Sequence, residues 1–93
     1  MDVEQIRPAA SASRELPRLE PVTLADGASL GEVIRIRRQM KKLSQQGLAD
    51  LAGVGRRFIG ELEAGKPTVE LGKALAACEV LGLVLTVKTS DAR

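Results

Sequence analysis

Residues 43–65 carry the pattern that most restricts the fold, because they predict two short helices joined by a tight turn. Ser44 can accept hydrogen bonds from the unpaired N–H groups that open the first helix. Gly53 can end this helix, since glycine adopts the left-handed conformation without a side-chain clash. The second helix is expected to begin near Gly55 and to stop before Gly65. The first helix has an apolar stripe at spacings of three and four, formed by Leu48, Ala49, Leu51 and Ala52.

The second of these helices carries different residue types on its two faces. Ile59 and Leu62 share one face, and the small side chain of Ala49 would let the two helices cross closely. The outward face opens with Arg56 and Arg57, at the place where a recognition helix carries side chains that reach base edges in DNA. The pattern therefore predicts a helix-turn-helix unit.

This pattern, from Leu43 to Gly65, resembles the Xre/Cro family of phage-repressor-like DNA-binding domains. Residues 56–68, followed by Leu81-Gly82-Leu83, are more specifically similar to the HipB branch of antitoxins. The resemblance covers residues 29–88. It implies a mainly α fold, in which a four-helix domain is followed by one C-terminal β-strand that pairs across a dimer.

The HipB-like resemblance also implies partners. Proteins of that branch are homodimers that repress their own operon and bind a HipA-like serine/threonine kinase toxin. We therefore expect palindromic double-stranded DNA, a second copy of the chain and a kinase toxin as partners. The alternative is a solitary Xre-family transcriptional regulator without a toxin. A pure interaction module is disfavoured, because Arg56 and Arg57 remain at reading positions.

Composition excludes several other classes of function. A chain of 93 residues supports one small domain. With no His and one Cys, the chain alone cannot form a zinc finger or a His-based catalytic site, and no cofactor, metal or enzymatic activity is expected. Cys78 lies in an apolar helical pattern, which predicts a reduced core residue. The absence of a membrane-length apolar run and of a secretory signal predicts a cytoplasmic protein.

Charge is concentrated around the predicted helix-turn-helix. The net charge of the chain is only +2. Residues 30–66, however, hold eight basic and four acidic side chains, whereas residues 1–29 hold three basic and five acidic ones. Basic charge that coincides with a helix-turn-helix favours binding to duplex DNA. A single Phe and no Tyr or Trp argue against a stacking platform for single-stranded nucleic acid.

The chain divides into a predicted flexible arm at 1–27, the DNA-binding domain with its dimerisation strand at 28–89, and a tail at 90–93. The arm holds three of the four prolines. Within it, Val22-Thr23-Leu24 could form a short strand. Asp26-Gly27 is expected to form a turn.

A helix is predicted from about Leu30 to Met40, with Ser29 as a plausible cap. Its periodicity allows two inward faces, one with Val33, Ile36 and Met40 and another with Leu30 and Ile34. The family resemblance favours the second face, with Ile34 and Arg38 pointing inward and Arg38 paired with Glu63.

A last helix is predicted after Thr68 as its N-cap, ending at Gly82, with an apolar face of Val69, Leu71, Ala74, Leu75, Cys78 and Leu81. Residues 83–89 then alternate apolar and other side chains, which predicts a strand. Leu83, Leu85 and Val87 fall on one face of it. One strand needs a pairing partner, which would be residues 22–24 or the same strand of a second copy.

The predicted DNA contacts are of two kinds. The resemblance implies that Gln45 bonds a phosphate at a helix N-terminus. One of Arg57 and Arg56 is expected to read a guanine edge, with Arg57 the first candidate. Glu61 could accept from cytosine, steer an arginine or be only a surface carboxylate, and Phe58 could pack in the core or touch a thymine methyl. Peripheral phosphate contacts are assigned to Lys41, Lys42 and Lys66.

Overall fold

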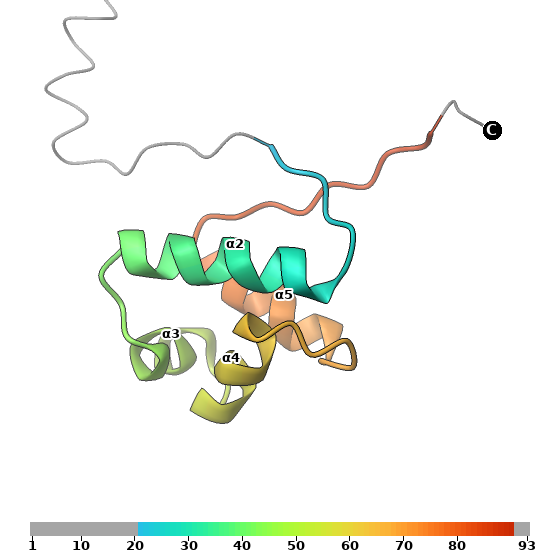
Figure 1. The fold of residues 1–93 in the computed structure, drawn as a ribbon. Coiled ribbons are helices and arrows are strands. Elements are labelled where there is room, and N and C mark those ends of the chain that lie inside the picture. The colour runs from blue at the N-terminus through green and yellow to red at the C-terminus, as the bar shows by residue number, and fades with distance from the viewer. Residues whose placement is uncertain (1–20, 91–93) are drawn as a thin grey trace, which may run out of the picture.

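The computed structural model describes residues 21–90, and this part of the chain contains four helices and no strand. The helices are α2 (Gly27–Met40), α3 (Gln45–Ala52), α4 (Arg56–Glu63) and α5 (Leu71–Val80), drawn in Figure 1. In that view α2 lies across the top of the helical body and α3 and α4 lie below it. The four-helix fold predicted from the resemblance is confirmed. Most of the predicted arm and tail lies outside the described residues.

Helix α2 begins earlier than the sequence pattern predicts. Asp26 is its N-cap and accepts from the backbone N–H of Ser29 at 3.0 Å, so the helix starts at Gly27 rather than near Leu30. Ser29 is therefore a donor to the cap and not the cap itself; its hydroxyl also donates to Asp26 at 2.9 Å. An ionised carboxylate at this place is favoured by the positive end of the helix dipole.

The helix-turn-helix at α3 and α4 agrees closely with its prediction. Ser44 accepts from the N–H of Gly47 at 2.8 Å, and Gly53 ends α3 in the left-handed conformation with φ of 74°. Gly55 precedes α4, as expected. One residue of the predicted apolar stripe is placed differently. Leu51 is 64% exposed, because the inward face of α3 is formed by Leu48 and Ala49, with Ala52 partly buried beside them.

Helix α5 starts later than predicted. Pro67 and Thr68 form a turn, the backbone at Glu70 is extended, and Glu70 rather than Thr68 is the N-cap. Leu71 is consequently 65% exposed, although the pattern assigned it to the apolar face. At the other end, the N–H groups of Gly82 and Leu83 bond the carbonyls of Glu79 and Cys78, which closes the helix as predicted.

The core draws side chains from all four helices of the described part. Ile34 is fully buried, so the predicted phase of α2 with Ile34 inward is confirmed. Cys78 is free and 2% exposed, and burial raises the pKa of its thiol, as expected for an unreactive core cysteine. The buried apolar residues are Ile34, Leu48, Ala49, Ile59, Leu62, Ala74, Ala77, Cys78 and Leu81.

Gly31 allows α2 to lie directly against the end of α4. A Cβ atom at this position would lie 2.5 Å from the carbonyl oxygen of Leu62 and 2.6 Å from that of Glu63. Contact this close is possible only without a side chain, so Gly31 sets the distance between the two helices. No sequence pattern indicated this role.

Neither terminal segment of the described part forms a strand. Residues 22–24 and 83–90 are irregular, so the predicted strand at 22–24 is not formed and does not pair with the C-terminal segment. Val84 and Val87 are 83% and 96% exposed in the single chain. Pairing of residues 83–88 with a second copy stays a prediction. None of the helices between residues 21 and 90 is long and apolar enough to span a membrane.

Candidate nucleic-acid interface

A largely buried ion pair joins α2 to the end of the predicted recognition helix α4. Arg38 donates to Glu63 through Nε at 2.6 Å and through Nη2 at 3.0 Å. The two side chains are only 12% and 4% exposed. Arg38 also donates to the carbonyl of Leu43 in the turn before α3, at 2.8 Å. The fork predicted from the resemblance is therefore present, and its hydrogen bonds raise the pKa of Arg38.

Gln45, the first residue of α3, links this pair to the start of α4. Its Nε2 donates to Glu63 Oε1 at 3.1 Å, and its Oε1 accepts from Arg56 Nη1 at 3.2 Å. The amide thus connects a buried carboxylate to an exposed arginine. The family resemblance implied a phosphate contact for Gln45, which stays a prediction. The two bonds seen here were not predicted, because residues 18 and 11 positions apart show no pairing signal in one sequence.

Arg57 lies in a separate ionic cluster. Its Nε is 3.3 Å from Glu61 Oε2, one helical turn on, and the Arg57 side chain is 92% exposed. Glu61 also pairs with Lys66, with Nζ 3.5 Å from Oε1. Glu61 thus pairs with an arginine in the free protein, and its role toward DNA stays a prediction. Exposed pairs of this kind contribute little to stability.

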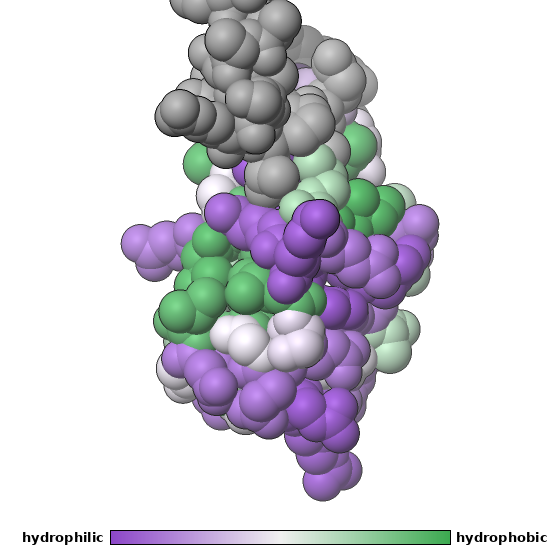
Figure 2. Space-filling view, turned by 90° about the vertical axis from the view of Figure 1, so that its left-hand side faces the viewer, coloured by the Kyte–Doolittle hydropathy of each residue, from purple (hydrophilic) through white to green (hydrophobic). Residues whose placement is uncertain are grey.

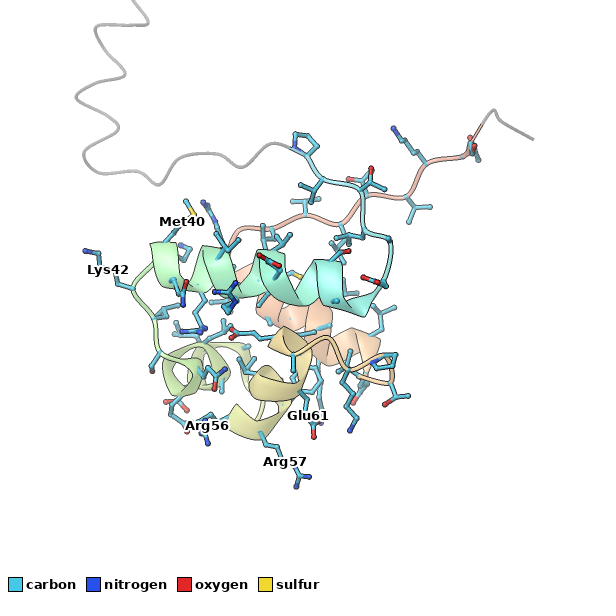
Figure 3. The ribbon with its side chains drawn as sticks, viewed as in Figure 1. Met40, Lys42, Arg56, Arg57 and Glu61 are labelled. Carbon is cyan, nitrogen blue, oxygen red and sulfur yellow. The ribbon has the colours of Figure 1, made fainter. Side chains whose placement is uncertain are left out.

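Figure 3 shows where the labelled polar side chains point. Arg56, Arg57 and Glu61 project from α4 on the side away from α2, and Lys42 projects at the corner between α2 and α3. Lys42 has φ of 59°, a left-handed conformation that is uncommon outside glycine. Lys42 therefore closes the turn after α2 at some cost in backbone energy.

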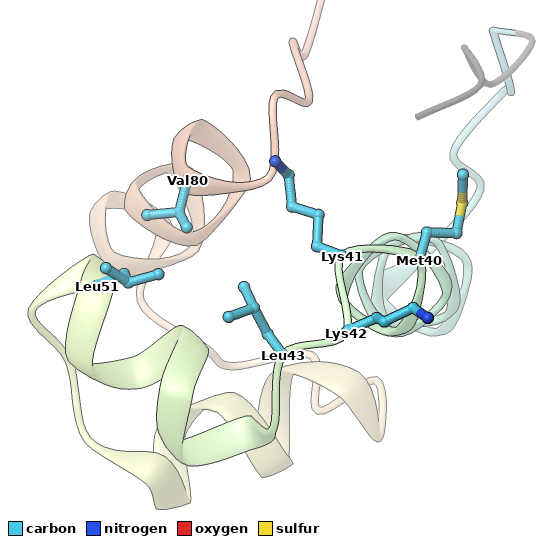
Figure 4. A pocket seen from close by; sticks show the side chains of 6 residues that line it. All are labelled: Met40, Lys41, Lys42, Leu43, Leu51 and Val80. Carbon is cyan, nitrogen blue, oxygen red and sulfur yellow. The ribbon is translucent and has the colours of Figure 1, made fainter. Parts of the chain in front are cut away.

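Lys41 has different surroundings from Lys42, although the two are adjacent. Figure 4 shows Lys41 extending toward the segment after α5 and Lys42 extending the other way. An open apolar groove lies here between α2, α3 and α5, and Figure 2 shows the hydrophobic surface on this side of the molecule, bordered by hydrophilic side chains. The groove is lined by Met40, Lys41, Lys42, Leu43, Leu51 and Val80. The phosphate contact assigned to Lys41 stays a prediction.

Phe58 is partly buried and packs against the core from α4. The Nζ of Lys73 on α5 lies 5.9 Å from the centre of its ring, which is within range of a cation–π contact. The free protein thus uses Phe58 for packing, and its contact with a thymine methyl stays a prediction. Among residues 21–90, no group of three or more acidic or Cys side chains is placed to hold a metal ion.

The geometry defines a class of protein. Two short helices are joined by a turn that contains the left-handed residue Gly53, and the second helix begins with two exposed arginines (Figure 3). This is the arrangement of a DNA-binding helix-turn-helix domain. The chain belongs to the helix-turn-helix family, which matches residues 34–86.

Relatives and solved structures agree with this assignment. The chain is 47% identical over 60 residues to the uncharacterized HTH-type transcriptional regulator y4mF of Sinorhizobium fredii, a match covering 64% of this chain and 79% of that protein. Its fold is similar to HipB in an O4 20mer complex, with a TM-score of 0.67 and 20% identity over 78% of this chain and all of the other. The fold is also similar to HipB(S29A) in an O2 20mer complex, with a TM-score of 0.69 and 20% sequence identity. That match covers 80% of this chain and 100% of the other.

Proposed function

We propose that this protein is a sequence-specific transcriptional repressor that binds a palindromic operator as a homodimer. The observation that carries the proposal is the exposed start of α4, where Arg56 and Arg57 follow a helix-turn-helix turn of the expected geometry. Kinship with an HTH-type transcriptional regulator supports the regulatory role. Two recognition helices related by a two-fold axis would contact two half-sites about one helical turn apart.

The dimer is proposed to form through residues 83–88, with Leu83, Leu85 and Val87 on one face of the strand. Val87 is 96% exposed in the single chain, so a second copy that covered it would remove apolar surface from water. A two-stranded ribbon is marginal in water alone, so burial against the α5 helices of both copies would stabilise it.

The same protein is proposed to be the HipB-like antitoxin of a type II toxin-antitoxin pair, repressing its own operon and binding a HipA-like kinase toxin. Likeness in fold to HipB and the Leu81-Gly82-Leu83 sequence before the terminal segment support this assignment. The second candidate is a solitary regulator without a toxin. A kinase-like reading frame next to this gene, whose product copurifies with the protein, would favour the antitoxin; a lone gene would favour the regulator.

DNA binding is tested by titrating a labelled fragment of the gene's own upstream region against random duplex at two salt concentrations. We expect tighter binding to the upstream fragment, with affinity falling steeply as salt rises because phosphate contacts release counterions. Equal affinity for both duplexes at both salt concentrations would contradict a sequence-specific repressor.

Dimerisation is tested by sedimentation of the full chain and of a chain truncated after Gly82. The truncated chain should be monomeric and should lose operator affinity, although the side chains of α4 are intact. Leu85→Pro should act in the same direction, because proline removes a ladder donor from a central strand position. A truncated chain that stayed dimeric with unchanged affinity would place the dimer contact elsewhere.

A further inference from the structure

We propose that Arg37 is a positioning residue that fixes the two DNA-binding domains of the dimer relative to each other, and so sets the half-site spacing that the dimer accepts. This inference rests on the proposed function, because it assumes an operator-binding homodimer joined through residues 83–88. It gives a role to a side chain of α2 that lies at the exit of that segment, away from the exposed start of α4.

A glycine joint separates α5 from the C-terminal segment. Leu81 is the C-cap of α5, and Gly82 follows it in the left-handed conformation with φ of 74°. Glycine adopts this conformation without a side-chain clash, but its backbone is also less restricted than that of any other residue. Rotation about ψ of Leu81 and φ of Gly82 turns the planar peptide between them and swings the segment relative to the domain. A dimer joined through residues 83–88 therefore needs another group to restrict this joint.

Arg37 holds the peptide plane at the joint. Its Nε donates to the carbonyl oxygen of Leu81 at 2.9 Å, and this oxygen belongs to the peptide between Leu81 and Gly82. Its Nη2 lies beside the joint as well, because a Cβ atom at Gly82 would lie 3.6 Å from it, in ordinary van der Waals contact. The bond is partly buried, where a hydrogen bond is stronger than at the surface. Arg37 thus restricts the torsions that glycine leaves free.

The helical turn that carries Arg37 is itself fixed to the helix-turn-helix. The next residue, Arg38, donates to Glu63 at the end of α4 and to the carbonyl of Leu43 before α3. Two adjacent side chains of α2 therefore hold two backbone segments, the entry into the helix-turn-helix and the exit of α5. The direction of the C-terminal segment is thereby tied to α4 as well as to α5.

The C-terminal segment is held at its start and uncovered further on. The N–H of Leu83 bonds the carbonyl of Cys78 at 2.9 Å, and Leu83 packs against the core. Val84 and Val87 are exposed. A second copy would thus meet a segment whose start is already directed, which lowers the entropy lost on pairing. Because each paired segment would leave its domain in a fixed direction, the two copies of α4 would be held at one separation.

The test measures operator affinity against half-site spacing, with the full-length protein and a duplex that the wild type selects from a random library. Duplexes with one base pair added or removed between the half-sites are compared with the selected one. The variants are Arg37→Met, which removes the donor, and Arg37→Lys, which keeps a cationic donor. Asp26→Ala is the matched control, because it removes the N-cap of the same helix and lowers stability without touching the exit of α5.

We expect the wild type and Asp26→Ala to lose at least about tenfold affinity on either altered duplex, because the DNA must be twisted or bent to bring its half-sites into register. Arg37→Met should lose less than about threefold, because turning at Gly82 replaces deformation of the DNA. Arg37→Lys should restore part of the wild-type preference. Arg37→Met with the spacing preference of the wild type would overturn the inference, as would equal broadening by Asp26→Ala.

A second measurement uses only the wild type, so it does not depend on the folding of a variant. The Nε–Hε signal of Arg37 in the nitrogen–proton correlation spectrum should keep its position as the protein is diluted from mainly dimeric to mainly monomeric. A signal that moved on dilution to the position of exposed arginines would overturn the inference, because the bond would then follow pairing instead of preceding it.

The outcomes separate this inference from the proposed function. A wild type that is monomeric in sedimentation, or a library that yields no selected sequence, would overturn the proposed function together with the inference. A dimeric wild type with a selected operator, combined with an unchanged spacing preference in Arg37→Met, would overturn the inference alone.

Discussion

Arg37 on α2 donates through Nε to the carbonyl oxygen of Leu81 at 2.9 Å, joining residues 44 positions apart. Leu81 is the C-cap of α5, where the last carbonyl groups lack helical partners and the helix dipole favours a cation. The contact therefore fixes the end of α5 and the direction in which the C-terminal segment leaves the domain.

Arg37→Met should lower the free energy of unfolding by about 1–2 kcal/mol, since a hydrogen bond from a charged group to a partly buried carbonyl is lost. Urea denaturation measures this change. Arg35→Met is the matched control on the same helix: Arg35 pairs with Glu32 at 3.6 Å with 42% and 63% of the two side chains exposed, and its loss should cost less than about 0.5 kcal/mol. Equal effects of the two substitutions would contradict a specific role for Arg37.

Arg38→Met should destabilise the fold by about 3–5 kcal/mol, because it leaves the carboxylate of Glu63 buried without its main partner. The double variant Arg38→Met/Glu63→Leu should recover most of that loss, since no buried charge then remains. Urea denaturation of the three proteins forms the test. A double variant no more stable than Arg38→Met would show that the fork itself, and not the isolated charge, determines stability.

Lys42→Gly should keep or raise the stability of the fold by up to about 1 kcal/mol while weakening DNA binding. Lys42 has φ of 59°, and glycine adopts this conformation without the Cβ clash, although it loses more entropy on folding. Loss of the positive charge should lower affinity for all duplexes alike, because phosphate contacts do not depend on sequence. Thermal melting and binding to specific and random duplex are the two measurements. A clear loss of stability would contradict the strain assigned to Lys42.

Asp26→Ala should lower the melting temperature at neutral pH, and the difference from wild type should disappear in acid. Hydrogen bonds from the backbone N–H and then the hydroxyl of Ser29 hold the pKa of Asp26 below its ordinary value. A lowered pKa in the folded state stabilises the fold above the ordinary Asp pKa of about 3.9, and this stabilisation is lost as pH falls through the folded-state pKa. Asp26→Asn keeps a cap without a titrating group, so its stability relative to Asp26→Ala should not follow this pH change.

Gly31→Ala should destabilise the fold by about 2 kcal/mol or more, because the new Cβ would lie 2.5 Å from a backbone oxygen of α4 that cannot move independently. Gly72→Ala is a control with the opposite sign. A Cβ there meets only the flexible Glu70 side chain at 3.7 Å, and alanine favours the helix by up to about 1 kcal/mol. Similar destabilisation by both substitutions would contradict the close contact at Gly31.

The parts of the fold that depend on nearby residues were predictable from the sequence. Ser44 and Gly53 are the N-cap and C-cap of α3, and each bonds only residues three or four positions away, so both ends of α3 were predicted correctly. The start of α5 was predicted wrongly. Threonine is a common N-cap residue, so Thr68 was a reasonable choice, but Pro67 and Thr68 lie in a turn that precedes the helix. The role of Gly31 depends on α4, about thirty residues later, and short-range periodicity carries no information about it.

The candidate site divides in the same way. The exposed arginines at the start of α4 followed from the helical period, and the Arg38–Glu63 fork followed from the family resemblance. The contact of Gln45 with Arg56 depends on the crossing angle of two helices, and a single sequence does not specify that angle. Lys41 and Lys42 were grouped because both are basic and adjacent, but Figure 4 shows that they extend in different directions.

Phe58 has a practical consequence. The chain contains one Phe and no Tyr, Trp or His, so every aromatic ring proton of the protein belongs to a single side chain on α4. In D₂O the aromatic region of the proton spectrum is therefore a report on that helix alone. The ring signals can therefore follow the change at α4 on DNA binding without isotope labelling of the protein. The added duplex is deuterated, so that its own base signals do not overlap with those of the ring.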